Sequence, residues 1–438
     1  MKSLLLSRIF VWVFLAVAPL NFLLAEPGLQ TASRLPRTNL LVYHNRDGKV
    51  LPVKSKADWQ KRRVEILRGM QSVMGELPGR EKLCRLDLKV ESETDCGSYV
   101  RRFVTYASEP VTGGTGVSPV VSGVPPETVE RRAFSDGRTS TSNLNLTTKF
   151  GGTPNLTGET PVPPTKYSRV PAFLLIPKVA LTSKKKFPAV LALHPTDMEF
   201  GHRVLVEQLR PGYRAYANDL AERGFVVLAP AYPLMANYQP DLKALGYRSG
   251  TMKAIWDNMR GLDLLESLPF VKRGKFGALG HSLGGHNAIY TAVFDERIKV
   301  VVSSCGFDSY VDYMNGNITG WTSERYMPKL AEYRGRLQEI PFDFHEMIAA
   351  LAPRVCFINA PLGDANFKWR SVDEIVCAAS QIYRLYGVGN NLRVEHPNCG
   401  HDFPERERGI ALDLLQKSLK ISVEFAGKGR EKPIAVQY

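Results

Sequence analysis

Short apolar runs alternate with helical segments through the second half of the chain, and this pattern predicts the fold. The runs are almost continuously apolar, which is typical of strands that are buried on both faces of a parallel sheet. Most of them are separated by segments with apolar residues at helical spacing, such as 214–224 and 252–268. The predicted strands are FPAVLALH (187–194), FVVLAPAY (225–232), KFGALG (275–280), KVVVSSC (299–305), RVCFINA (354–360) and LRVEH (392–396). We therefore expect an α/β fold with a mostly parallel central sheet and helices on both faces.

An amphipathic helix is predicted near the start of the chain, over residues 55–75. Its apolar residues recur at helical spacing, Ser55 with Asp58 can cap its beginning, and Gly75 can end it. Strand-like pieces follow at CRLDLKV (84–90) and YVRRFVTYASE (99–109). We expect residues 26–109 to pack on the core as a helix and edge strands.

The composition changes abruptly at 110–166, which is rich in Gly, Thr, Ser, Pro and Asn. The segment repeats itself, since GGTGVSPVVSGVPPET is echoed by GGTPNLTGETPVPPT, and it resembles translated interspersed repeats of bacterial genomes. It has too few core-forming residues to offset its ordering entropy, so we predict a disordered insertion. Joining RRFVTYASEP (101–110) to YSRVPAFLLIPK (167–178) gives an antiparallel hairpin at the edge of the sheet. Hairpin tips tolerate insertions, and we expect no catalytic role here.

The first 25 residues have the layout of a secretory signal peptide. Lys2 and Arg8 precede an apolar run that closes near Ala25, and an uncleaved membrane anchor is the alternative. We expect export to the periplasm or the medium, with no stable membrane span after cleavage. A basic tail is expected at 421–438.

Charge and cysteine content exclude several classes of protein. The net charge of +14 is scattered and comes without a nucleic-acid motif, so we interpret it as a solvated surface and expect no nucleic-acid partner. The six cysteines are not arranged as metal-ligand pairs, so their spacing predicts no metal site. Cys84 and Cys96 can either bridge a hairpin or remain small buried thiols. The oligomeric state is left open.

One serine lies in a pentapeptide that is typical of hydrolases, Gly280-His281-Ser282-Leu283-Gly284. A G-x-S-x-G match alone is weak, and an ordinary turn is the alternative. Here the motif follows a predicted strand and opens a predicted helix, which is the context of a nucleophile elbow. Because a serine hydroxyl is unreactive at its own pKa, Ser282 then needs a base and a group that orients the base.

Those partners are expected on loops after later strands, in the chain order nucleophile, acid, histidine. Asp364 follows the strand at 354–360, and His401 follows the strand at 392–396. Asp308 is the second candidate for the acid, whereas Asp373 lies in the following helix. Three other histidines are weaker candidates for the base. His281 lies in the elbow itself, His286 lies about one turn into the following helix, and His396 ends a strand.

An oxyanion hole is expected from two backbone N–H groups. One belongs to Leu283, directly after the serine, and the other comes from the loop after the strand at 187–194. Pro195 has no N–H, so we expect Thr196 to be the second donor.

The motifs GHSLGGHNAIYTAVFDERIKVVVSSCGF, NAPLGDANF and EHPNCGHDFP resemble exported bacterial α/β-hydrolases of the dienelactone-hydrolase-like and acetyl-xylan-esterase-like group. There is a more distant likeness to prolyl oligopeptidase catalytic domains. The resemblance covers 167–420 and the helix and strands before the insertion. It implies an α/β-hydrolase fold, a triad of Ser282, Asp364 and His401, and cofactor-free hydrolysis of esters through an acyl-serine.

The expected substrate is a small-molecule or carbohydrate ester, with acetyl esters of carbohydrates as one option. A serine peptidase or amidase, and a non-catalytic binding protein on the same scaffold, are the alternatives. The segment 306–350 is rich in Tyr, Trp and Phe and is either a cap over the serine or an ordinary excursion packed on the sheet. Fold alone does not decide among these substrates.

Overall fold

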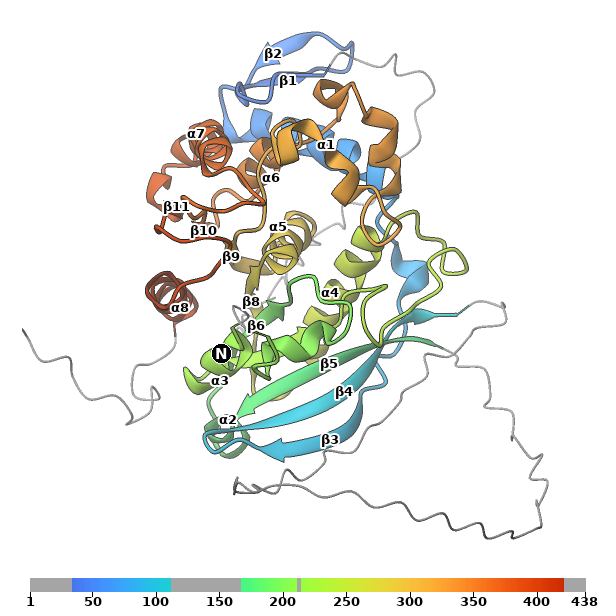
Figure 1. The fold of residues 1–438 in the computed structure, drawn as a ribbon, viewed down its shortest axis with the longest axis vertical. Coiled ribbons are helices and arrows are strands. Elements are labelled where there is room, and N and C mark those ends of the chain that lie inside the picture. Colours follow the sequence, from blue (N-terminus) through green and yellow to red (C-terminus); the bar gives the residue numbers. More distant parts are fainter. Residues whose placement is uncertain (1–33, 112–166, 211–213, 421–438) are drawn as a thin grey trace, which may run out of the picture.

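A computed structural model describes residues 34–111, 167–210 and 214–420 of the protein (Figure 1). The expected signal peptide, most of the expected insertion and the basic tail lie outside these residues. In the described part of the chain, a large sheet has the strand order β11-β10-β9-β8-β6-β7-β5-β4-β3. Its strands are β3 (Lys89–Asp95), β4 (Tyr99–Pro110), β5 (Tyr167–Pro177), β6 (Phe187–Leu193), β7 (Val226–Pro230), β8 (Val271–His281), β9 (Ile298–Ser304), β10 (Val355–Asn359) and β11 (Leu392–Glu395).

The strands from β6 to β11 pair in parallel, whereas β3, β4 and β5 pair antiparallel at one edge. The helices are α1 (Lys56–Met74), α2 (Lys178–Thr182), α3 (Tyr216–Glu222), α4 (Gly250–Ser267), α5 (Leu283–Phe294), α6 (Phe344–Ala350), α7 (Trp369–Leu385) and α8 (Glu405–Leu419). A separate small sheet pairs β1 (Val42–His44) with β2 (Val50–Pro52). The predicted α/β fold is confirmed.

The central parallel strands β6 and β7 are apolar throughout because they bury both faces. Val190 of β6 packs in a core with α3 and α8, while its neighbour Leu191 packs on the opposite face with α4, α5, α6 and α7. Successive side chains of a strand point to opposite faces, so a strand that is buried on both faces needs apolar residues at every position.

The predicted N-terminal helix is confirmed as α1. The Ser55 hydroxyl accepts a hydrogen bond from the backbone N–H of Asp58 at 3.2 Å, and Gly75 ends the helix with φ 98°. Because φ in this range costs little only for glycine, the helix stops where the sequence indicates.

The edge hairpin predicted on either side of the insertion is confirmed by the pairing of β4 with β5. The pairing extends to Pro110 opposite Tyr167, at the two ends of the predicted insertion. Cys84 and Cys96 are unpaired. Cys84 precedes β3, whereas Cys96 follows it directly. Leu86, near Cys84, bonds to Ala107 of β4, and Cys96 bonds to Tyr99 at the start of β4. A strand rises about 3.3 Å per residue, so the two cysteines lie much farther apart than the Cα separation of about 4.4–6.8 Å in a disulfide.

The segment 306–350 contains mostly short 3-10 helices and ends in α6. These short helices are η3 (Tyr313–Gly316), η4 (Ile318–Trp321), η5 (Pro328–Tyr333) and η6 (Leu337–Glu339). Asp343 and Glu346 begin α6 with a reciprocal capping box, and both side chains are fully buried.

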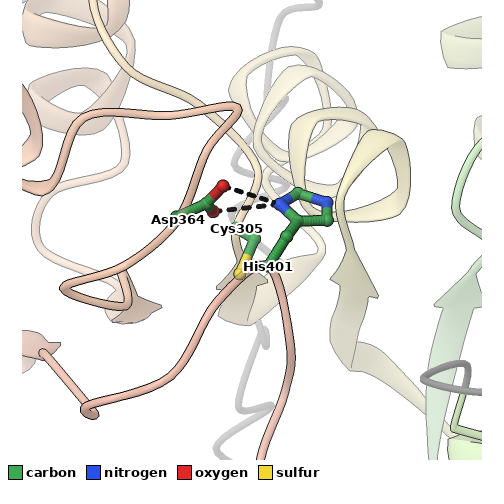
Figure 2. A group of neighbouring side chains, drawn as sticks. All are labelled: Cys305, Asp364 and His401. Atoms are coloured by element: carbon green, nitrogen blue, oxygen red, sulfur yellow. Dashed lines mark hydrogen bonds and ion pairs between the residues drawn. The ribbon is translucent and has the colours of Figure 1, made fainter.

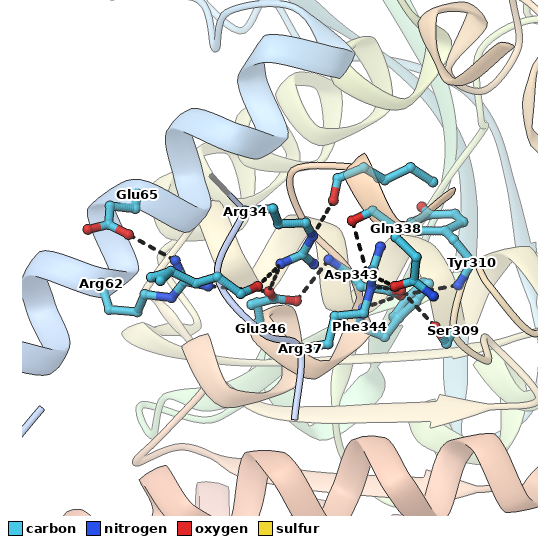
Figure 3. Close-up of polar contacts among 12 residues, drawn as sticks. Arg34, Arg37, Arg62, Glu65, Ser309, Tyr310, Gln338, Asp343, Phe344 and Glu346 are labelled. Atoms are coloured by element: carbon cyan, nitrogen blue, oxygen red, sulfur yellow. Dashed lines mark hydrogen bonds and ion pairs between the residues drawn. The ribbon is translucent and has the colours of Figure 1, made fainter. Parts of the chain in front are cut away.

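Arginines from the N-terminal segment and from α1 neutralise these two carboxylates (Figure 3). Arg34 contacts Glu346 at 2.7 Å, Arg37 contacts Asp343 at 2.9 Å, and Arg62 of α1 contacts Glu346 at 3.4 Å. The chain before β1 is thereby tied to the start of α6. Among the described helices, none is both long enough and apolar enough to cross a membrane.

Candidate active site

Ser282 occupies a sharp turn between β8 and α5. Its backbone has φ 55° and ψ −123°, a conformation that costs a non-glycine residue about 1–3 kcal/mol. The N–H of Ser282 donates to the carbonyl of Ser304, at the end of the neighbouring strand β9, at 2.8 Å. The turn is therefore held in place by the adjacent strand, as in the expected strand-turn-helix context.

The glycines on either side of Ser282 are required by close backbone contacts. A Cβ atom at Gly280 would lie 2.1 Å from the carbonyl carbon of Gly284, and one at Gly284 would lie 1.9 Å from the carbonyl oxygen of Leu193. Any larger residue would push the turn away from β6.

The side chains of His401 and Asp364 are hydrogen-bonded across two loops (Figure 2). The His401 Nδ1 lies 3.0 Å from Oδ1 and 2.9 Å from Oδ2 of Asp364. The Asp364 side chain is 1% exposed and that of His401 is 24% exposed. Burial alone would raise the pKa of Asp364, but the hydrogen bond and charge of His401, with the N–H groups of Asn366 and Phe367, outweigh it and lower the pKa. Asp364 thus stays a carboxylate that fixes the His401 ring.

Hydrogen bonds between the loop of Asp364 and the loop of His401 hold these two side chains within hydrogen-bonding distance. The N–H of Gly363 donates to the carbonyl of Cys399 at 2.9 Å. The amide of Asn359, the last residue of β10, donates to the Asp402 carbonyl at 2.9 Å and to the Ser304 hydroxyl at 2.8 Å. Asn359 therefore links the histidine loop to the strand end that holds Ser282. Its only signal in the sequence is a polar residue at the end of an apolar run.

Ser282 and His401 line one cavity of about 280 Å³, close to the lower end of the roughly 300–1,000 Å³ typical of ligand pockets. The expected oxyanion donors, Leu283 and Thr196, line it too. The remaining wall is largely aromatic, with three rings from the segment 306–350 and one from the Asp364 loop: Tyr313, Trp321, Tyr326 and Phe367.

The rival histidines have other partners. His281 is buried and its Nδ1 contacts the Ser304 hydroxyl at 3.0 Å, while His286 of α5 is buried and stacks on Trp321. Burial lowers the pKa of each to about 3. His396, at the end of β11, contacts Asp373 of α7 at 2.8 Å.

Asp308, the second candidate for the acid, accepts a hydrogen bond from the N–H of Lys368 at 3.1 Å. Burial, reinforced by Asp312 and Asp343, raises the pKa of Asp308 to about 7. Asp308 thus supports the beginning of α7, whereas Asp364 is the carboxylate that contacts His401.

His194 was not singled out from the sequence, yet it holds the loop that carries Thr196. Its Nε2 accepts from the N–H of Tyr232 at 2.9 Å, and its Nδ1 donates to the Pro195 carbonyl at 2.7 Å. Burial lowers the pKa of His194 to about 4, which keeps the ring neutral so that Nε2 remains an acceptor.

Comparison with known proteins points to carbohydrate esterases. A family model described as glucuronyl esterase of fungi matches residues 241–387, about a third of the chain. A putative hydrolase, YtaP, of Bacillus subtilis is 26% identical over 266 residues, covering 58% of this chain and 85% of that protein. A 4-O-methyl-glucuronoyl methylesterase of Hypocrea jecorina is 25% identical over 207 residues, covering 41% of this chain and 43% of that protein.

Solved structures share the fold. A glucuronoyl esterase from Solibacter usitatus has a TM-score of 0.61 at 18% identity and covers 89% of this chain and 99% of its own. A glucuronoyl esterase from Teredinibacter turnerae has a TM-score of 0.58 at 15% identity, with 87% and 88% covered. The expected likeness to α/β-hydrolase esterases is confirmed, but these comparisons do not support the finer likeness to dienelactone hydrolases or prolyl oligopeptidases. Fold and relatives together indicate that the chain is a carboxylic ester hydrolase of the α/β-hydrolase type.

Proposed function

We propose that the protein hydrolyses carboxylic esters of carbohydrates through a triad of Ser282, His401 and Asp364. One observation carries the proposal: a histidine that is hydrogen-bonded to a buried aspartate shares a small cavity with a serine on a strained strand-to-helix turn. This arrangement has the parts that nucleophilic catalysis requires, namely a nucleophile, a base and a group that orients the base.

In the proposed reaction, the His401 Nε2 takes the Ser282 proton as the hydroxyl oxygen attacks the ester carbonyl. Asp364 accepts the hydrogen bond from Nδ1–H and stabilises the imidazolium that forms. His401 then gives the proton to the departing alcohol, which leaves an acyl-serine. Water repeats the sequence, with His401 as base, and releases the acid.

Hydrogen-bond donors near the Ser282 turn are required to stabilise the negative charge that develops on the carbonyl oxygen. Leu283 is the first residue of α5, where backbone N–H groups point out of the helix end, and Thr196 lines the same cavity. The Thr196 hydroxyl lies 3.0 Å from the hydroxyl of Tyr326, which adds a contact between the loop after β6 and the segment 306–350. We propose that both N–H groups form the oxyanion hole.

The lining of the cavity favours an uncharged carbohydrate ester. Aromatic rings give flat apolar surfaces for sugar rings, and Asn366 adds an amide. The described lining holds no Lys, Arg, Asp or Glu. A neutral ester enters such a site more easily than the carboxylate that it yields, because burying an unpaired charge is costly. In this proposal the segment 306–350 acts as the cap.

Several of the similar proteins are glucuronoyl esterases, and we propose glucuronoyl esters as the first substrates to test, with acetylated sugars as the second. The proposal also includes export, which would bring the enzyme to polymeric carbohydrates outside the cell. A peptidase with the same triad is the competing activity.

The test compares methyl glucuronate esters, acetylated xylo-oligosaccharides and peptide anilides on the wild type and on Ser282→Ala. Ser380→Ala, on the outside of α7, is the matched control. We expect hydrolysis of at least one carbohydrate ester, loss of several orders of magnitude in Ser282→Ala, and wild-type rates in the control. Activity confined to peptide anilides, or retained in Ser282→Ala, would overturn the proposal.

A further inference from the structure

Cys305 lies beside the Asp364 and His401 pair, and no step of the proposed hydrolysis uses it. It follows β9 with φ 47°, and its thiol donates to the Asp402 carbonyl at 3.3 Å. The Cys305 sulfur, one ring nitrogen of His401 and one carboxylate oxygen of Asp364 all lie within 4.8 Å of one another. Figure 2 shows Cys305 and Asp364 on the same side of the His401 ring, the side of Nδ1.

The three donors are of the kinds that zinc binds. Zn²⁺ takes thiolate sulfur at about 2.3 Å, imidazole nitrogen at about 2.0–2.1 Å and carboxylate oxygen at about 2.0–2.2 Å. Ligand atoms in a tetrahedron of this size are separated by about 3.3–3.8 Å. The His401 Nδ1 and the Asp364 oxygens, at 2.9–3.0 Å, therefore need to move slightly apart, while the Cys305 sulfur needs to approach by at most about 1 Å. A thiolate and a carboxylate together carry two negative charges, which balance a divalent cation.

We propose that Cys305, Asp364 and His401 form an inhibitory site for a thiophilic divalent cation such as Zn²⁺. The ion reaches the site along the His401 ring, whose side chain is 24% exposed, since those of Asp364 and Cys305 are buried. The three ligands lie far apart in the sequence, which is why their spacing gives no metal motif.

Inhibition follows from the position of one proton. In the active arrangement Nδ1–H donates to Asp364, and the lone pair of Nε2 is free to accept the Ser282 proton. A metal ion on Nδ1 leaves the single proton of the neutral imidazole on Nε2, so the ring no longer acts as a base. The Cys305 thiol releases its proton to solvent as the sulfur binds. Ser282 itself is untouched.

The first experiment measures hydrolysis of 4-nitrophenyl acetate by the full chain against ZnCl₂, with MgCl₂ as the hard-cation control. We expect Zn²⁺ to inhibit and Mg²⁺ to have no effect. Cys305→Ser keeps the uninhibited rate, and its inhibition constant for Zn²⁺ rises about tenfold or more, since loss even of a supporting group costs metal sites about 10–100-fold. Cys399→Ser, in the His401 loop, is the matched control and keeps wild-type sensitivity. Equal inhibition of wild type and Cys305→Ser would overturn the proposal.

The second experiment does not depend on activity. Titration with Cd²⁺ gives an ultraviolet thiolate-to-metal charge-transfer band, and we expect one equivalent of this band to be lost in Cys305→Ser and kept in Cys399→Ser. If Cys305→Ser fails to fold, Cys305→Ala serves in its place. The inhibition measurement rests on the proposed function, but the Cd²⁺ band does not, so failure of the metal site and failure of the esterase assignment are distinguishable. A band that is unchanged without Cys305 contradicts the site.

Discussion

The indole of Trp321 lies flat against the imidazole of His286, with ring centroids 4.4 Å apart and planes 11° apart. His286 in turn stacks on Tyr290, at 4.3 Å and 22°. Trp321 lines the cavity, while His286 and Tyr290 belong to the helix that Ser282 begins. One wall of the cavity is thus fixed to the helix behind the serine.

Replacement of His286 should therefore change substrate binding. Each aromatic pair contributes about 0.5–1.5 kcal/mol, so His286→Ala should raise KM for a carbohydrate ester about 2- to 10-fold. Hydrolysis of 4-nitrophenyl acetate should hardly change, because this small ester does not need the Trp321 ring. His286→Phe keeps the stack and should restore KM. Equal losses on both substrates, or no rescue by phenylalanine, would show that His286 does not position Trp321.

Asp364→Asn should prevent His401 from acting as the base, although the imidazole stays in place. The asparagine amide would donate to Nδ1 and hold the His401 proton on Nε2, where it cannot accept a proton from Ser282; we expect kcat to fall by about 10⁴. Asp373→Asn, which alters the carboxylate beside His396, is the control and should keep the wild-type kcat. A small effect of Asp364→Asn would indicate that another group orients His401.

The stability of the fold should depend on pH through Asp308. Its pKa is raised to about 7 in the folded protein, against about 3.9 in an unfolded chain. The folded state therefore holds the proton more tightly, and the stability gained from this is present below about pH 4 and lost as the pH rises through 7. Asp308→Asn stays neutral and still accepts from the N–H of Lys368. Its free energy of unfolding should rise relative to wild type by up to about 4 kcal/mol between pH 4 and pH 8.

Denaturant unfolding at the two pH values measures this difference. If the free energy of unfolding changes with pH equally in wild type and Asp308→Asn, the raised pKa of Asp308 is contradicted.

Arg37→Ala should destabilise the protein by about 3 kcal/mol, because it leaves the buried Asp343 carboxylate without its cation. Asp343→Asn in the same background should recover part of this loss, since the amide carries no charge. Lys61→Ala, which breaks an ion pair on the surface of α1, is the control and should cost less than about 1 kcal/mol. Losses of similar size in Arg37→Ala and Lys61→Ala would show that the contact with Asp343 is not a stabilising one.

Much of the fold was predictable because strands that are buried on both faces of the sheet appear in the sequence as continuous apolar runs. The runs 187–194 and 299–305 have continuous apolar stretches, and the structure has β6 and β9 there. The strand β3 was predicted at 84–90 but lies at Lys89–Asp95, since it is exposed along its whole length and shows no alternation. In 306–350 the short 3-10 helices have too few residues to repeat a pattern.

The site was predictable where it follows strand ends. Asp364 and His401 lie on loops after successive strands, and the order along the chain suggests how they meet. The roles of His194 and Asn359 were not predictable, because the residues that they contact, Tyr232 and Asp402, are distant in sequence. Which aromatic rings line the cavity depends on packing such as the stack of Trp321 on His286, and no local pattern encodes it.

The most direct test of the account is the site at which a fluorophosphonate labels the protein, located by peptide mass spectrometry. We predict one adduct, on Ser282, that is absent from Ser282→Ala and forms much more slowly in His401→Ala, because the histidine must take the serine proton. No adduct on the wild type, or an adduct that persists in Ser282→Ala, would contradict the assignment of Ser282 as the nucleophile.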